Sequence, residues 1–153
     1  MRVSAKTDYA LRAAVELAAA APEGLPVKGE RLATSQSIPL RFLENILLQL
    51  RHAGIVESRR GADGGYKLAR APGDITLADV IRAIDGPLAG VSGQRPETLD
   101  FKGSSEPLRE VWIAVRASLR SVLEQVTLAD IAANELPANV RELTEAPDAW
   151  VPH

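Results

Sequence analysis

Residues 28–70 carry the pattern that most constrains the fold, because two helical segments are followed directly by a pair of strands. Residues 28–35 have the apolar spacing of a short helix, and a second helical pattern runs from residue 39 to about residue 53. Residues 55–59 and 66–70 have the composition of strands and flank a glycine-dense turn, which predicts a β-hairpin. This order predicts a mainly α fold with a β-hairpin wing, the winged helix-turn-helix.

The second helix of this run has signals at both ends and one apolar face. Pro39 suits the first turn, where its missing N–H costs nothing, and Gly54 suits the C-cap. Five apolar residues share one face, and we expect them to be buried: Phe42, Leu43, Ile46, Leu47 and Leu50. In a winged helix-turn-helix protein this is the helix that enters the DNA major groove.

Capping signals mark the helices on either side of this run. Ser4 is placed to cap a helix that runs to about Ala21, and Thr76 begins a helix that ends near Asp85. The tetrad Thr-Leu-Ala-Asp at residues 76–79 recurs at residues 127–130, and each aspartate favours a helix N-terminus. We interpret the two copies as helix starts and not as a repeated domain.

The C-terminal half combines a long loop with a repeating apolar seam. The seam advances in steps of four and three residues: Leu108, Trp112, Val115, Leu119, Val122 and Val126. Either this helix packs on its own domain or it pairs with its twin, and the repeat favours a homodimer. The expected regions are a winged helix-turn-helix domain (1–86), a loop (87–107), a dimerisation helix with a following short helix (108–136) and a flexible tail (137–153).

Charge and cysteine content narrow the range of functions. Residues 1–70 carry 11 Lys and Arg against 7 Asp and Glu, whereas residues 71–153 carry 7 against 13, so the basic half favours an anionic partner. The chain has no cysteine and only two histidines, which excludes disulfides, catalytic thiolates and cysteine-ligated clusters. No apolar run spans a membrane and no signal peptide is evident, so we expect a cytoplasmic protein.

Double-stranded DNA is the anionic partner that the winged-helix pattern predicts. Arg41, in the first turn of the recognition helix, suits a bidentate contact to guanine; the alternatives are a phosphate contact or a solvated side chain. The arginines beside the glycine turn suit a wing that reaches phosphates or a minor groove. The candidate DNA-binding residues are Lys28, Ser37, Pro39, Arg41, Phe42, Arg51, Arg59, Arg60 and Gly61.

Several stretches of the chain resemble a known bacterial family. They read IPLRFLE at 38–44, LRHAGIV at 50–56 and SRRGADGGY at 58–66, with MRVSAKTDYA at 1–10 and ITLADVI at 75–81. Over about residues 1–130 the chain resembles the Rrf family of regulators, the group that contains IscR, NsrR and CymR. The resemblance implies a dimeric winged-helix transcription factor, usually a repressor, whose long C-terminal helix crosses to the partner subunit.

The same resemblance directs attention to the loop before that helix. In the cluster-binding members of the family, three cysteines lie there, whereas the corresponding residues 91–106 contain none. Asp8 matches a carboxylate that some relatives use as a fourth ligand, but without the cysteines we do not carry that role over. We therefore expect no iron–sulfur cluster, no metal and no other cofactor.

Three hypotheses for regulation remain open. A small effector would lie between the loop and the first helix of the partner subunit; alternatively a partner protein controls the regulator, as the resemblance to the CymR branch implies. In the third, nothing binds, and Arg12 and Asp8 pair with loop charges to hold one DNA-competent form. The candidate residues of the effector region are Asp8, Arg12, Arg95, Glu97, Asp100 and Glu106.

Two other classes of function fit the sequence less well. An enzyme needs a nucleophile–base pair or a carboxylate pair in a cleft, and this chain is poor in histidine, lacks cysteine and has no phosphate-binding glycine loop. We therefore expect no enzymatic activity. A winged-helix module that binds other proteins is the alternative to a DNA-binding regulator, and a gel shift on DNA discriminates between the two.

Overall fold

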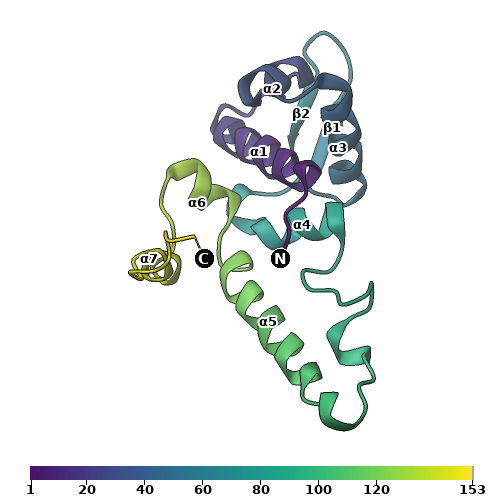
Figure 1. Ribbon diagram of the computed structural model, residues 1–153. Coiled ribbons are helices and arrows are strands. Elements are labelled where there is room, and N and C mark those ends of the chain that lie inside the picture. The colour runs from purple at the N-terminus through teal and green to yellow at the C-terminus, as the bar shows by residue number, and fades with distance from the viewer. Residues whose placement is uncertain (153) are drawn as a thin grey trace.

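The computed structural model describes residues 1–152 and has the predicted winged-helix architecture (Figure 1). Its helices are α1 (Ala5–Ala20), α2 (Gly29–Gln36), α3 (Leu40–His52), α4 (Leu77–Asp85), α5 (Leu108–Leu123), α6 (Leu128–Ala133) and α7 (Ala138–Thr144). The strands β1 (Val56–Arg59) and β2 (Gly65–Leu68) form one antiparallel hairpin. None of the helices within residues 1–152 is long and apolar enough to cross a membrane.

Helix α1 forms the centre of the core, because small residues line its buried face. Ala10, Ala13 and Ala14 are completely buried, so α3, α4 and α6 can all approach α1 closely. The side chain of Ser4 caps the helix by accepting a hydrogen bond from the backbone N–H of Thr7, as the sequence predicts. Thr7 is itself buried, and its hydroxyl donates to the Asp85 carboxylate at 2.5 Å, which joins the start of α1 to the end of α4.

A single residue before α2 attaches the hairpin to the helical body. Val27 pairs with Tyr66 of β2, donating to its carbonyl at 2.7 Å and accepting from its N–H at 2.8 Å. Within the hairpin Glu57 faces Lys67, and their side chains form an ion pair at 3.0 Å. The wing therefore has backbone hydrogen bonds along both edges of β2.

Helix α5 projects away from this body, with the loop that precedes it alongside (Figure 1). Every residue of α5 is at least partly exposed, whereas the chain returns to the core directly afterwards, at Val126 and Leu128. Both Thr-Leu-Ala-Asp tetrads form capping boxes, as predicted. They lie side by side, because Leu77 N–H donates to Val126 and Leu128 N–H donates to Ile75, each at 2.9 Å.

The structure departs from the sequence predictions in several details. Phe42 was expected to be buried but is 41% exposed, because it lies at the rim of the core against Tyr9. The C-cap of α3 is Ala53, and Gly54 follows it with a φ of +72°. Residues 138–144, expected in a flexible tail, form helix α7, while His153 lies outside the described residues.

Candidate nucleic-acid interface

The turn between α2 and α3 exposes the first turn of the recognition helix. Ser37 ends α2 in the left-handed conformation with a φ of +53°, and Ile38 then inserts into the core. Pro39 is the N-cap of α3, so the helix starts one residue later than the position predicted for it. Arg41, the second residue of the helix, is exposed and open to a ligand.

A stack of side chains from α1 supports this turn. The ring of Phe42 meets the ring of Tyr9 edge-on, with centroids 5.7 Å apart, and the Arg12 guanidinium lies 4.7 Å from the centroid of Tyr9. Arg12 also pairs with Asp8 at 2.9 Å and donates to the carbonyl of Gln36 at 3.0 Å. Phe42 is thus positioned by packing and remains 41% exposed, so its proposed contact with DNA stays a prediction.

Asp8 and Arg12 therefore belong to the helix-turn-helix frame. Within one chain, Asp8 and Arg12 pair with each other and Arg12 also binds the end of α2; the hypothesis that they pair with loop charges stays a prediction. The remaining candidates of the effector region lie elsewhere: Glu97 pairs with Arg116 of α5, and Asp100 and Glu106 are exposed. One chain does not bring the six candidates into one site.

The wing tip carries the exposed residues Arg59, Arg60 and Gly61. Lys28, proposed as a phosphate contact, is the N-cap of α2 and donates from Nζ to the carbonyl of Ala62 at 2.6 Å, so it fastens the wing turn to the helix. Arg51 similarly donates to the hydroxyl of Ser58 at 3.0 Å, joining the last turn of α3 to β1. Sequence patterns gave no sign of these positioning contacts, because they form between elements.

The two glycines that end the wing turn have no room for a side chain. A Cβ on Gly64 would overlap the backbone carbonyl of Arg59, and one on Gly65, which has a φ of +147°, would lie 2.5 Å from the carbonyl oxygen of Val27. These contacts are with backbone atoms, which cannot swing aside. The glycines thus serve the shape of the wing, as the sequence predicts.

Substituting Gly64 with alanine is expected to distort the wing. The overlap with Arg59 has to be relieved by moving the backbone of the turn, which should cost about 1–3 kcal/mol of the free energy of unfolding and speed amide exchange in 56–68. Hydrogen exchange and urea denaturation measure both effects. Gly73→Ala is the matched control, because a Cβ there meets no atom within 4 Å; equal behaviour of the two variants would contradict the steric argument.

Comparison with known proteins places these features in a family. Residues 3–134 match the family model Rrf2, described as an iron-dependent transcriptional regulator. An HTH-type transcriptional regulator of Mycobacterium tuberculosis is 50% identical over 145 residues, which covers 95% of this chain and 89% of the relative. Among solved structures, CymR, the global cysteine regulator of B. subtilis, superimposes with a TM-score of 0.75 at 35% identity, covering 88% of this chain and 98% of CymR. IscR of T. potens gives 0.70 at 37% identity and 88% coverage of both chains.

The family description mentions iron, but this chain lacks a matching set of iron ligands among its described residues. The chain has no cysteine, and residues 1–152 contain no group of three His, Asp or Glu side chains placed to hold a metal ion. The residues present therefore do not fit a cysteine-ligated cluster, and the family's sensing chemistry is not transferable to them. The helix-turn-helix, the wing and the extent of the match are unaffected by this difference, and on these grounds the chain belongs to the Rrf2 family of transcriptional regulators.

Proposed function

We propose that this protein is a sequence-specific DNA-binding repressor that acts in the cytoplasm as a homodimer without an iron–sulfur cluster. The observation that carries the proposal is the grouping of α2, α3 and the hairpin at one end of the molecule, with α5 projecting at the other (Figure 1). Arg41 and the wing arginines are exposed on that end. A helix beside a basic wing is the arrangement with which winged-helix proteins contact DNA.

The two exposed basic elements have different tasks in this proposal. Arg41 lies in the first turn of α3, where a guanidinium reaches the edge of a guanine and forms two hydrogen bonds. Arg59 and Arg60 lie at the tip of the hairpin and neutralise phosphates, which carry no sequence information. Lys28 and Arg51 hold the wing relative to α2 and α3, so they act as positioning residues.

Homodimer formation through α5 is supported by the exposed apolar residues of that helix. Leu108, Val111 and Val115 are between 41% and 50% exposed although they lie on an amphipathic helix. Helices of this kind usually bury their apolar face, and the predicted seam offers the same face to a second copy. Within the single chain, the 87–107 loop covers only part of this apolar face of α5.

Arginine substitutions separate base reading from phosphate binding. Arg41→Ala is expected to lower affinity for the cognate site by about 1–3 kcal/mol while leaving nonspecific binding nearly unchanged. Arg59→Ala with Arg60→Ala is expected to weaken binding to all sequences. The slope of log affinity against log salt concentration should fall by about two, because two phosphate contacts are lost. Gel shifts at several salt concentrations measure both, and identical behaviour of the two variants would contradict the assigned roles.

Selection of bound sequences from random DNA tests the proposed function itself. We expect a palindromic site whose half-sites are about one helical turn, or a multiple of one turn, apart, because a two-fold dimer presents two recognition helices. Binding without sequence preference, or no binding at low salt, would exclude a specific repressor. A single unpaired half-site would exclude the homodimer on DNA.

A further inference from the structure

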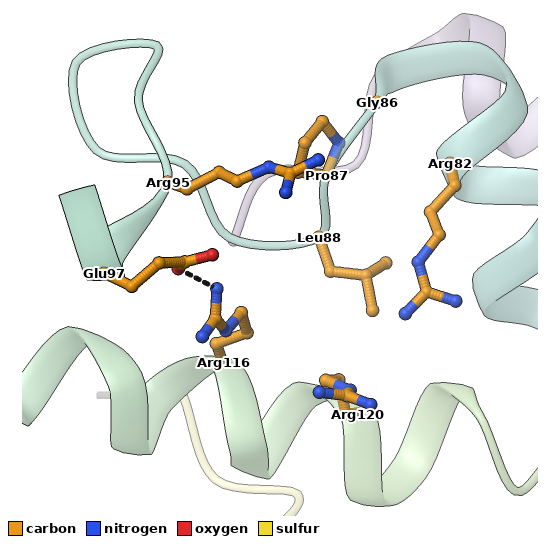
Figure 2. A pocket seen from close by; sticks show the side chains of 8 residues that line it. All are labelled: Arg82, Gly86, Pro87, Leu88, Arg95, Glu97, Arg116 and Arg120. Atoms are coloured by element: carbon orange, nitrogen blue, oxygen red, sulfur yellow. Dashed lines mark hydrogen bonds and ion pairs between the residues drawn. The ribbon is translucent and has the colours of Figure 1, made fainter.

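Four arginines surround one open pocket of about 440 Å³ between the end of α4, the loop that follows it and α5 (Figure 2). Arg82 comes from α4, Arg95 from the loop, and Arg116 and Arg120 from successive turns of α5. Leu88 lies in the middle of the pocket. The pocket has the volume of a site for a small organic molecule and lies on the α5 side of the body, away from the wing.

Two carboxylates neutralise only part of this positive charge. Glu97 pairs with Arg116, and Glu124 pairs with both Arg82 and Arg120, the latter at 3.0 Å. A backbone hydrogen bond and the Arg116 side chain lower the pKa of Glu97, and the hydrogen bond from Arg82 lowers that of Glu124, so both are ionised at neutral pH. Four guanidinium groups thus face two carboxylates.

Arg95 is the arginine least committed to the protein. It takes part in no ion pair within residues 1–152, and its side chain extends across the pocket towards Pro87 (Figure 2). The carbonyl end of α4 adds about half a negative charge nearby, which is smaller than the surplus of two positive charges. The pocket is therefore an electropositive site with unused hydrogen-bond donors.

We propose that this pocket binds a small organic dianion that has an anionic group at each end. The arginines fall into two groups around the two carboxylates. Arg82 and Arg120 share Glu124, whereas Arg116 pairs with Glu97 and Arg95 lies close enough to Glu97 to lower its pKa. Guanidinium groups bind carboxylate and phosphate oxygens in pairs of parallel hydrogen bonds. A short carbon chain between the two anionic groups would lie against Leu88. The side chain of Leu88 then gives this uncharged part of the ligand an apolar contact.

The position of the pocket gives the ligand a means of regulation. It contacts α4, which belongs to the winged-helix body, and α5, which projects from it, so a bound dianion bridges the two. A ligand shifts a conformational equilibrium only when it binds the two states unequally, and a bridging ligand favours one angle between α4 and α5. This consequence rests on the proposed DNA-binding function, whereas ligand binding itself does not.

Calorimetric titration of the full chain in the absence of DNA tests the site. The probes are succinate, glutarate and adipate, with butyrate as the matched monoanion and inorganic phosphate as a dianion that carries its charges on one group. We expect at least one dicarboxylate to bind more tightly than butyrate and phosphate, with an affinity that falls as salt is raised. Equal or stronger binding of phosphate, or no binding of any dicarboxylate at millimolar concentration, would overturn the proposal.

Three variants assign the binding to this pocket. Arg95→Ala is expected to weaken dicarboxylate binding about tenfold, since it removes one charged hydrogen-bond donor without breaking an ion pair. Glu97→Gln is expected to strengthen binding, because it removes the carboxylate that occupies Arg116. Arg141→Ala, on the exposed surface of α7, should have no effect. An equal loss in Arg95→Ala and Arg141→Ala, or weaker binding in Glu97→Gln with an unchanged melting temperature, would refute the assignment.

A gel shift with and without the bound dicarboxylate separates this proposal from the proposed function. A change in DNA affinity that disappears in Arg95→Ala supports regulation through the pocket. Specific DNA binding that the dicarboxylate leaves unchanged would refute the regulatory step alone. Calorimetric binding without any DNA affinity would instead refute the proposed function and leave the ligand site supported.

Discussion

Substituting both Val111 and Val115 with glutamate is expected to convert the proposed homodimer into a monomer. The two side chains are 50% and 41% exposed in the single chain; Val115 lies on the seam proposed to pair with its twin, and Val111 is an apolar neighbour that widens the same face. Burying an apolar side chain of this size contributes about 1.5–3 kcal/mol, and two chains would together bring four glutamates into the contact. The dissociation constant of the dimer should rise by a hundredfold or more, which analytical ultracentrifugation measures.

The same substitution should weaken operator binding by about a hundredfold, because each monomer then binds one half-site without the effective concentration that the dimer supplies. Ala117→Glu combined with Ser121→Glu is the matched control, since both positions are exposed and lie on the opposite side of α5. A seam variant that keeps the mass of a dimer would show that α5 packs elsewhere. A control variant that dissociates as readily would show that added charge alone is responsible.

Shortening Leu128 to alanine is expected to have the largest effect on stability. Leu128 is completely buried in the core against α1, and its N–H donates to the carbonyl of Ile75 at 2.9 Å. Leu-to-Ala substitutions in a close-packed core cost about 2–5 kcal/mol, because the cavity is only partly refilled. Urea denaturation should show this loss at an unchanged slope.

Leu143 provides the control for this prediction, because it is 57% exposed on α7 and its truncation removes little buried surface. Leu143→Ala should change the free energy of unfolding by less than about 0.5 kcal/mol. A similar loss in both variants would mean that α6 does not anchor the end of α5 to the core. The contrast therefore tests whether residues after α5 belong to the winged-helix body.

The fold was predictable from local patterns, because capping residues, apolar spacing and turn glycines act over a few neighbouring residues. Ser4, Thr76 and Thr127 form the caps that the sequence indicates, and the wing turn has the required glycines. Phe42 was misassigned because helical spacing does not distinguish the centre of a core from its rim. Its neighbour Tyr9 lies on another helix, which no periodicity within α3 reveals.

The arginine pocket and the contact of Arg12 with α2 were also not predictable, because each joins residues from different elements. Arg82, Arg95 and Arg116 are separated by more than ten residues each, and only the path of the loop brings them together. Arg116 and Arg120 do carry a local signal, since they lie one helical turn apart, but that spacing is equally common on solvated faces. Asp8 and Arg12 were considered as partners of loop charges, whereas their own spacing of four residues favours the pair that they form.

The twin capping boxes have a mechanical consequence. The backbone hydrogen bonds between Leu77 and Val126 and between Leu128 and Ile75 join the start of α4 to the start of α6. After α4, the 87–107 loop and α5 form a closed excursion from the body, and lengthening the loop of such an excursion adds only a small entropic cost at each doubling. The excursion can therefore gain or lose residues without moving the wing. The C-terminal end of α5 is therefore held to the body both by these hydrogen bonds and by the ion pair between Glu124 and Arg82 of α4.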